Sequence, residues 1–263
     1  MIGKRQRARD AQYPAARGRT ISSGGIGSAW GSGVMKLYNF AFGPYPQRVT
    51  IYLAEKGLAD VDLILLEAPR GKSNWSPAVI KALSPSGSLP IIVDDDGTVV
   101  GQSLAILEYL EDTRPCPEMR GKTSRDRART REITIVLDEA LTFFGIWARH
   151  GSRLNRGVDR ESQDTAAIGA ERYFQKLRLA ERMIGDAEFI AGDSVTTADC
   201  VAMAALNFTR GFYGVPIPSD CARLSGWYAR FSLRPSVPTP DYPPEQHALA
   251  LDLMAQTGIG VQS

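Results

Sequence analysis

Hydrophobic and polar positions divide the chain into two parts with different periods. From Met35 to about residue 113, short apolar runs alternate with turn residues and with amphipathic stretches of helix length. After residue 113, the apolar positions recur only at three- and four-residue steps, and no strand pattern appears. Such steps place side chains on one face of a helix, so the second part is predicted to be entirely helical.

The first part begins with a strand–helix–strand pattern. Apolar positions predict strands over Met35–Phe40 and Val61–Leu66, with an amphipathic helix over Gln47–Lys56 between them. Gly57 stands where that helix would end, because glycine is the usual residue after a helix C-terminus. Two strands joined through a helix run in the same direction, so we expect this pair to be parallel.

A strand–turn–strand–helix pattern follows. The turn Asp94–Gly97 separates apolar runs at Ile91–Val93 and Thr98–Val100, and an Asp-Gly pair at this spacing predicts an antiparallel hairpin. Ser103 is expected to cap the next helix. The first part is therefore predicted to be an α/β domain with a mixed four-stranded sheet and helices packed on it.

The second part is predicted to hold long amphipathic helices. One covers Ile133–Trp147 and another covers roughly residues 165–185. Thr196 is placed to cap a third helix, with the Asp199 carboxylate beside the positive helix end. The stretch Cys200–Leu206 is apolar on every side, so this helix is expected to be central in an all-α bundle.

The composition excludes several classes of protein. The longest apolar run has seven residues, Cys200–Leu206, whereas about 18 are needed to cross a bilayer, so no membrane span is expected. Three scattered cysteines are too few for a disulfide scaffold in 263 residues. The two histidines lie far apart and near no cysteine pair, so no metal site is expected.

Residues 1–34 differ from the rest of the chain. They hold six basic residues and one acidic residue, are rich in Arg, Ser and Gly, and show no apolar period. We expect a disordered extension; an upstream start codon before a protein that begins at Met35, or an organelle-targeting segment, are the alternatives. The remaining residues carry 25 basic against 28 acidic side chains, which argues against nucleic acid as a partner.

Three segments resemble the cytosolic glutathione S-transferase family. Arg48–Gly57 is similar to the family's first helix, and Phe189–Asp199 is similar to its capped central helix. Between them, Ser84–Pro90 and then Gln102–Glu111 are similar to the family's glutathione-binding segments. Each motif is moderately specific, and their common order and spacing make the resemblance strong over about residues 35–237.

The resemblance implies a thioredoxin-like domain followed by an all-helical domain. The expected boundaries are the extension 1–34, the glutathione-binding domain 35–113, a linker 114–123 and the acceptor-substrate domain 124–263. It also implies a cytoplasmic homodimer that takes part in detoxification, with glutathione as co-substrate and neither membrane nor nucleic acid as partner.

The resemblance assigns glutathione contacts to two short motifs. In the family, the proline that matches Pro90 is preceded by a cis bond, and the backbone that matches Leu89 pairs with the cysteinyl part of glutathione. Gln102 and Ser103 match residues that bind the γ-glutamyl end, where a helix N-terminus favours a carboxylate. Candidates for the glycyl carboxylate lie in the loop after the second strand: Lys72 and Trp75.

The residue that activates the thiol in relatives is missing. Counting back five positions from Arg48 reaches Gly43, where Ser- and Cys-type relatives have their catalytic side chain. Because a thiol of pKa near 8.5 is mostly protonated at neutral pH, some other group must stabilise the thiolate. Tyr45 is the candidate catalytic residue and a glutathione contact, and Tyr38 is a weaker candidate.

Aromatic side chains are candidates for an apolar acceptor pocket. Five are proposed to line it: Phe42, Phe144, Trp147, Phe208 and Phe212. The resemblance then implies a transferase that conjugates glutathione to a hydrophobic electrophile or uses it to cleave one. The alternatives are a non-catalytic glutathione-binding or carrier protein, which Gly43 keeps open, and a protein-interaction domain. A maleylacetoacetate-type isomerase is disfavoured because its Ser-Ser-Cys loop is absent.

Overall fold

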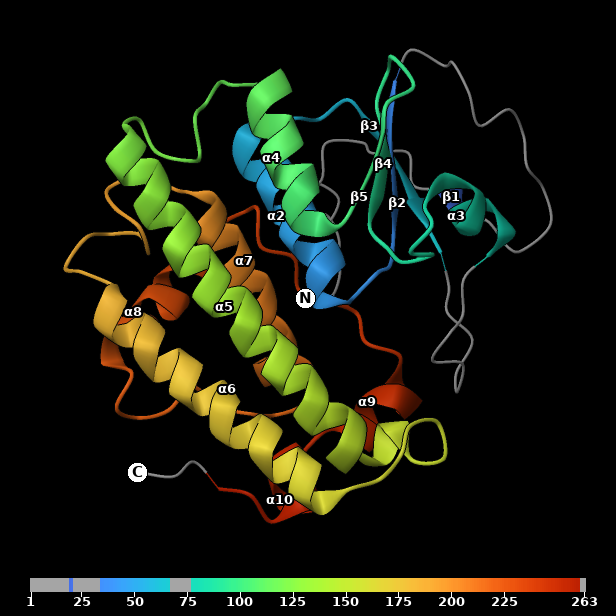
Figure 1. Cartoon of the computed structure of the whole chain (residues 1–263), viewed down its shortest axis with the longest axis vertical. Coiled ribbons are helices and arrows are strands. Elements are labelled where there is room, and N and C mark those ends of the chain that lie inside the picture. Colours follow the sequence, from blue (N-terminus) through green and yellow to red (C-terminus); the bar gives the residue numbers. More distant parts are fainter. Residues whose placement is uncertain (1–18, 21–33, 67–76, 261–263) are drawn as a thin grey trace, which may run out of the picture. The chain divides into compact units, whose positions relative to one another are not determined.

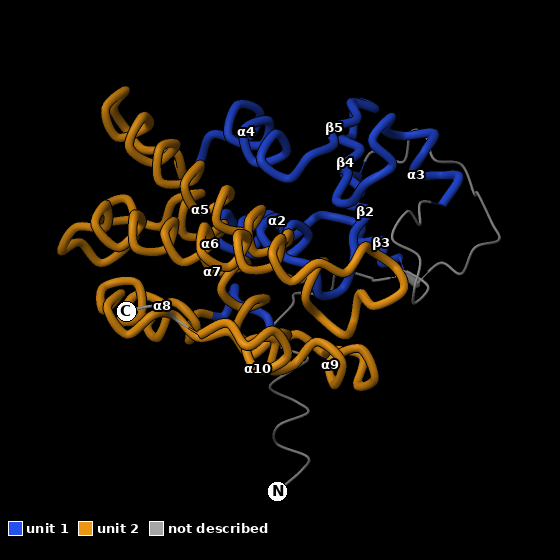
Figure 2. Tube along the Cα trace, turned by 60° about the horizontal axis from the view of Figure 1, so that its bottom comes forward, with its two compact units in different colours: residues 1–69, 74–117, 235–238 blue, residues 70–73, 118–234, 239–263 orange. Residues whose placement is uncertain are grey.

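The computed structural model describes residues 19–20, 34–66 and 77–260 (Figure 1). These residues divide into two compact units, coloured blue and orange in Figure 2. Unit 1 contains the described residues up to Pro117 together with Pro235–Pro238, and unit 2 contains Glu118–Arg234 and the described residues from Thr239. None of the described helices is both long and apolar enough to cross a membrane.

Unit 1 is built on a mixed sheet with strand order β1-β3-β2-β4-β5. Its strands are β1 (Arg19–Thr20), β2 (Met35–Asn39), β3 (Val61–Leu65), β4 (Ile91–Val93) and β5 (Val99–Gly101). β2 and β3 are parallel, and β4 is antiparallel to both β2 and β5. The predicted parallel pair and the predicted hairpin are therefore confirmed.

The edge strand β1 differs from the prediction. It pairs in parallel with β3 and makes the sheet five-stranded, although it lies in the extension that was expected to be disordered. Two residues are too few to show the alternation of apolar and polar positions that marks a strand, so no pattern could reveal it.

Helices cover both faces of the sheet (Figure 1). α2 (Pro44–Lys56) and α4 (Ser103–Thr113) lie side by side on one face, and α3 (Ala78–Leu83) lies on the other. A buried ion pair joins the first two, because Lys56 Nζ lies 2.6 Å from Glu111 Oε1. Tyr52 also donates to that carboxylate oxygen, at 2.6 Å. This buried ion pair ties the C-terminal halves of the two helices together.

Unit 2 contains helices and no strand among its described residues. They are α5 (Ser124–Gly151), α6 (Gln163–Met183), α7 (Thr197–Leu206), a π-helical turn (Asn207–Phe212), α8 (Ala222–Phe231), α9 (Pro244–Ala250) and α10 (Leu253–Thr257), with a 3₁₀ turn at Arg153–Asn155. α5 and α6 pack closely because Gly169 has no side chain. A Cβ there would lie 2.6 Å from the backbone nitrogen of Trp147.

The predicted N-terminus of the central helix is confirmed. Thr196 is the N-cap of α7, and Asp199 Oδ2 accepts hydrogen bonds from the Thr196 amide and hydroxyl, each at 2.8 Å. Asp199 Oδ1 accepts from the Ile190 amide at 3.0 Å and from Trp227 Nε1 at 2.8 Å. The buried carboxylate therefore joins α7 to the preceding loop and to α8. Burial raises its pKa, and these hydrogen bonds oppose that rise.

Candidate active site

The strand register brings three loops of unit 1 to one end of the sheet. Tyr38 lies opposite Ile91 in the β2–β4 pair, and Ile91 lies opposite Gly101 in the β4–β5 pair. The chain therefore leaves β2, enters β4 and leaves β5 at the same end of the sheet. The segments that follow or precede these residues are the loop 40–43, Leu89–Pro90 and Gln102–Ser103. The last two carry residues predicted to bind glutathione, and the first carries Gly43, the position of the missing catalytic side chain.

The turn before β4 packs against the end of β5. The Leu89–Pro90 peptide bond is cis, as predicted. Ser84 Oγ and Ser86 Oγ are hydrogen-bonded at 3.0 Å, and Ser86 Oγ and Ser88 Oγ at 2.8 Å. A Cβ on Gly101 would lie only 3.2 Å from Ser84 Oγ. Glycine at this position thus lets the serine-rich turn lie directly beside the strand that leads to Gln102.

Ser103 does not cap α4, and this prediction is wrong. Gln102 is the N-cap residue and makes no side-chain cap hydrogen bond, and Ser103 is the first residue of the helix. The first intrahelical hydrogen bond runs from the Ile106 amide to the Gln102 carbonyl at 3.0 Å. The amides of the three residues before Ile106 therefore have no partner within the helix and lie at its positive end. Ser103 is only 6% exposed. Its hydroxyl and these amides form a set of donors suited to a carboxylate.

Gln102 has a strained backbone that its sequence does not reveal. Its φ is 67° and its ψ is 115°, and its side chain is exposed. Only one other described non-glycine residue, Asp252, has positive φ. Such a conformation costs of order 1–3 kcal/mol and is concentrated at functional sites. Glutamine is not a residue that signals positive φ, so no local pattern could have predicted this feature.

The loop after β2 carries the position of the missing catalytic side chain. Gly43 is the N-cap of α2, with extended backbone angles of −73° and 149°. The helix begins with Pro44, earlier than predicted, because proline suits the first helical turn. Since Pro44 and Pro46 have no N–H group, Tyr45 alone among the first three helical residues has a backbone donor. The Gln47 side-chain amide donates to the Phe42 carbonyl at 3.3 Å and holds the loop.

Tyr45 and Tyr38 occupy different environments. Tyr45 is 40% exposed, and the Arg48 guanidinium carbon lies 4.9 Å from the centre of its ring. Tyr38 lies in the core cluster of unit 1 with Ile64 and Ile91. Burial, and secondarily the Asp62 charge, raise the pKa of the Tyr38 hydroxyl. Of the two, Tyr45 is therefore the side chain that a bound molecule could reach.

The acceptor-pocket candidates of unit 2 are mostly core residues. Phe144 and Trp147 have no exposed surface, and Phe212 has almost none. Phe144 packs edge-on against Tyr173 and Tyr213, with ring centroids 5.2 and 5.1 Å away. Aromatic residues at helical spacing fill the bundle interior here, so these three have no surface to offer a ligand.

Phe208 differs from the other candidates in unit 2 because it is partly exposed. It stacks on Phe212 with ring centroids 5.4 Å apart. In unit 1, Phe42 is buried and contacts Phe40 at 4.6 Å between ring centroids. Lys72 and Trp75 lie outside the described residues.

Comparisons with known proteins agree with this geometry. The family model of the glutathione S-transferase N-terminal domain matches residues 42–113, and that of the C-terminal domain matches residues 137–230. Glutathione S-transferase 2 of Saccharomyces cerevisiae is 28% identical over 212 residues, which cover 77% of this chain and 88% of that protein. Maleylacetoacetate isomerase of Pseudomonas aeruginosa is 33% identical over 169 residues, which cover 63% of this chain and 76% of that protein.

A solved structure shows the same architecture. The crystal structure of Gtt2 from Saccharomyces cerevisiae superposes with a TM-score of 0.68 at 26% identity, covering 77% of this chain and 98% of that one. The two matched domains, the mixed sheet with its cis-proline turn, and the capped central helix all agree with one assignment. The chain therefore belongs to the glutathione S-transferase family and is a glutathione-dependent transferase with a thioredoxin-like N-terminal domain and a helical C-terminal domain.

Proposed function

We propose that glutathione binds at the end of the unit 1 sheet where β4 begins and β5 ends. Ser103 and the first amides of α4 bind the γ-glutamyl carboxylate, and the Gln102 amide oxygen accepts from the glutathione ammonium group. The Leu89 backbone pairs with the cysteinyl residue, beside Pro90. Lys72 and Trp75 stay candidates for the glycyl carboxylate.

The single observation that supports this proposal is the Ile91–Gly101 pairing. It brings Leu89 and Ser103 to the same end of one hairpin, although they are fourteen positions apart in sequence. A tripeptide held by both Leu89 and Ser103 lies across this end of the sheet. The loop with Gly43 follows the neighbouring strand β2 at that same end of the sheet. We therefore infer that the glutathione sulfur is directed toward this loop.

We infer that Tyr45 stabilises the glutathione thiolate. Its hydroxyl and backbone amide are the donors that the start of α2 offers, and the dipole of that helix adds a favourable positive potential. The thiol gives up its proton to solvent water, and the sulfur electron pair forms a bond to an electrophilic carbon. The leaving group departs with the electron pair of the broken bond. Lowering the pKa of the glutathione thiol by one unit requires about 1.36 kcal/mol of preferential stabilisation of the thiolate.

We propose an apolar electrophile as the acceptor, and detoxification as the role of the reaction. The partly exposed ring of Phe208 in unit 2 is the aromatic candidate for contacting it. Isomerisation of a maleylacetoacetate-type substrate is less well supported despite the similar isomerases. The loop Phe42–Pro46 lacks the Ser-Ser-Cys motif on which the resemblance bases that reaction.

We further propose a cytoplasmic homodimer. The dimer rests on membership of the family. The compartment is supported by the three cysteines, Cys116, Cys200 and Cys221, which are all free thiols, as is usual in a reducing environment. Sedimentation velocity of the purified chain tests the dimer, and fractionation of cells tests the compartment.

The proposed site is tested by calorimetric titration of glutathione into the wild type and into Ser103→Ala. We expect the dissociation constant to rise about tenfold or more, because a hydrogen bond to a charged group contributes about 1.5–3 kcal/mol. Ser124→Ala is the matched control, since Ser124 is likewise the first residue of its helix but belongs to α5. Unchanged binding in Ser103→Ala, or equal loss in both variants, would refute the assignment.

A further inference from the structure

Three serines in the turn before the cis-proline bond are joined through their hydroxyl groups. Ser84 Oγ lies 3.0 Å from Ser86 Oγ, and Ser86 Oγ lies 2.8 Å from Ser88 Oγ. The Ser88 amide also donates to Ser86 Oγ, at 3.3 Å. We call these three residues the serine network. It ends directly before Leu89, the residue whose backbone we propose to pair with glutathione.

The Ser86 hydroxyl uses its whole hydrogen-bonding capacity within the network. A serine hydroxyl has one donor and two acceptor lone pairs. One lone pair accepts from the Ser88 amide, which can only donate. The contacts with the Ser84 and Ser88 hydroxyls then take the second lone pair and the donor. Although Ser86 as a whole is exposed, its hydroxyl is therefore directed into the turn.

Ser84 fixes one end of the network to the folded domain. It is the C-cap residue of α3, and its amide donates to the Ile80 carbonyl at 2.9 Å. Its own carbonyl accepts from the Gly87 amide at 3.0 Å. Ser84 is only 9% exposed, and a Cβ on Gly101 would lie 3.2 Å from its Oγ. This end of the network is thus held between α3 and β5.

Ser88 carries the restraint to the other end of the turn. Both its amide and its hydroxyl contact Ser86 Oγ, so one atom restrains the main chain and the side chain of Ser88. The residue between them, Gly87, has a φ of 61°. Because glycine gives the backbone little rigidity of its own, the hydrogen bonds across Gly87 supply a restraint that the main chain lacks.

Leu89 is then restrained from two sides. The network holds the residue before it, and its side chain packs against the core cluster of unit 1. A hydrogen bond weakens steeply when its angle departs from linearity, so a backbone that pairs with a peptide must present its N–H and C=O groups in a defined direction. A turn that is fixed before binding also loses less conformational freedom when the ligand arrives.

We propose that Ser86 is a positioning residue for glutathione. It holds the turn between Ser84 and Leu89 in the conformation in which the Leu89 backbone pairs with the cysteinyl residue. The inference rests on the proposed glutathione site and adds a residue that acts through Leu89 rather than by touching the ligand. Since Ser86 acts on the geometry of binding and not on the thiolate, its loss should change affinity and leave the rate of the bound complex unchanged.

Calorimetric titration of glutathione into the wild type, Ser86→Ala and Ser86→Thr tests the role of the hydroxyl. We expect the dissociation constant to rise about three- to tenfold in Ser86→Ala, whereas Ser86→Thr keeps the hydroxyl and should bind like the wild type. The value of kcat with a chlorodinitrobenzene at saturating glutathione should be the same in all three.

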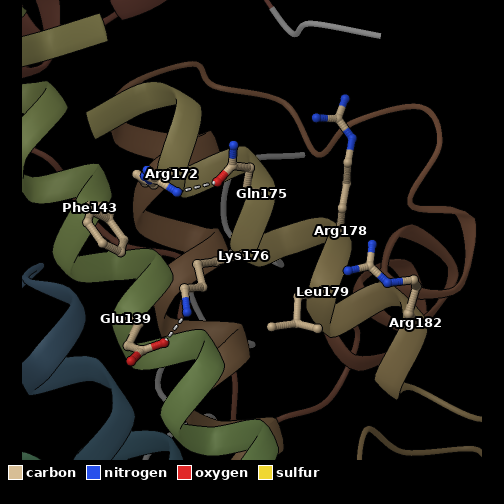
Figure 3. A pocket seen from close by; sticks show the side chains of 8 residues that line it. All are labelled: Glu139, Phe143, Arg172, Gln175, Lys176, Arg178, Leu179 and Arg182. Carbon is tan, nitrogen blue, oxygen red and sulfur yellow. Dashed lines mark hydrogen bonds and ion pairs between the residues drawn. The ribbon is translucent and has the colours of Figure 1, made fainter. Parts of the chain in front are cut away.

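Gln175→Ala is the matched control. Gln175 is likewise the middle of three hydrogen-bonded side chains, because it accepts from Arg172 at 3.1 Å and donates to Glu171 at 2.7 Å. It belongs to α6 in unit 2, where it lines the pocket shown in Figure 3. Its replacement removes two exposed side-chain hydrogen bonds far along the sequence from the turn, so glutathione affinity should not change.

A second probe locates the effect at Leu89. The glutathione analogue γ-glutamyl-N-methylcysteinyl-glycine lacks the cysteinyl N–H group that would donate to the Leu89 carbonyl. The wild type should bind this analogue more weakly than glutathione. With this bond already lost, Ser86→Ala should weaken binding of the analogue much less than it weakens binding of glutathione.

The outcomes separate this inference from the glutathione site itself. Unchanged glutathione affinity in a Ser86→Ala variant with the circular dichroism of the wild type would overturn the role of Ser86 and leave the site in place. Ser86→Thr binding as weakly as Ser86→Ala, or Ser86→Ala losing equally with both probes, would also overturn it. Equal affinity of the wild type for the two probes would refute the pairing at Leu89, and with it the proposed site.

Discussion

Ile91 lies directly opposite Gly101 in the antiparallel pair of β4 and β5. This relationship makes the cis-proline turn and the start of α4 neighbours, since Pro90 precedes one residue and Gln102 follows the other. The small size of Gly101 matters here, because its missing Cβ leaves room for the Ser84 hydroxyl. The sheet register, rather than any single side chain, therefore organises the proposed glutathione site.

The strained backbone of Gln102 predicts opposite effects on stability and on binding. Gln102→Gly removes the cost of a positive φ, so we expect the free energy of unfolding to rise by up to about 1 kcal/mol. The same change removes the side-chain amide that we propose accepts from the glutathione ammonium, so affinity should fall several-fold. Urea unfolding and calorimetry measure the two effects. Gln102→Ala is the control, since it loses the same amide but keeps the strain; a similar gain in stability there would contradict the explanation.

Restoring a hydroxyl at Gly43 should strengthen the thiolate. The backbone angles at Gly43 suit any residue, and a new Cβ would meet Pro46 Cδ at 3.2 Å, a contact that a small shift of the ring relieves. We expect Gly43→Ser to lower the pKa of bound glutathione by about one unit, measured from thiolate absorbance against pH. Gly43→Ala adds the Cβ without the hydroxyl and should have no such effect. Equal pKa values in the two variants would exclude a role for the hydroxyl.

Removing the Tyr45 hydroxyl should slow the reaction without weakening glutathione binding. The exposed Tyr45 ring keeps its contact with Arg48 in Tyr45→Phe, so the change is confined to one donor. We expect kcat/KM with a chlorodinitrobenzene to fall about tenfold or more, since a hydrogen bond to a thiolate is charge-assisted. Steady-state kinetics and glutathione titration separate the two effects. An unchanged rate would leave Tyr45 as a wall of the site rather than its catalytic residue.

The sequence predicted the elements whose signals are local. The Asp-Gly hairpin and the Thr196 cap each follow from a few neighbouring residues, and the parallel pair follows from one strand–helix–strand pattern. The structure confirms all three. The cis bond before Pro90 was expected from the resemblance rather than from residue chemistry, and it too is confirmed. β1 was missed, because pairing at a sheet edge needs no side-chain pattern over two residues.

The site was predicted less completely, for a physical reason. Whether Ser103 caps a helix or begins it depends on where the preceding strand ends, which one-dimensional patterns locate only to within a residue or two. Phe144 and Trp147 show the same limit. Their spacing places them on one helix face, but only the packed bundle decides that this face is enclosed rather than open to an acceptor.

The four hydrogen bonds to the Asp199 carboxylate predict a large contribution to stability. Asp199→Asn preserves the shape but puts an NH₂ group opposite backbone and indole donors, so we expect the free energy of unfolding to fall by about 3 kcal/mol. Thr196→Ala removes the cap and only one of the four hydrogen bonds to Asp199, and it should cost about 1 kcal/mol or more. Urea unfolding measures both. The exposed Asp193→Asn serves as control and should change stability by less than about 0.5 kcal/mol.

The Asp94 carboxylate should make stability depend on pH in the acid range. Burial alone would raise its pKa, but hydrogen bonds from Arg114, Tyr109 and the Asp95 amide outweigh that effect and hold the pKa below the ordinary 3.8. Both Arg114 terminal nitrogens donate, one to each carboxylate oxygen, at 2.9 and 2.6 Å. The folded state therefore binds this proton less readily than the unfolded state does.

The stabilisation from Asp94 is then fully present above pH 3.8 and is lost as the pH falls through the lowered folded value. We expect Asp94→Asn to reduce the free energy of unfolding by about 1–2 kcal/mol at pH 7, with the deficit constant down to about pH 5 and shrinking below pH 3.8. Urea unfolding at a series of pH values measures it. Asp95→Asn is the control, because its side chain is exposed and its backbone amide still donates to Asp94. A deficit that stays constant into the acid range would show that the Asp94 charge contributes nothing, and that Asn at this position acts only through packing.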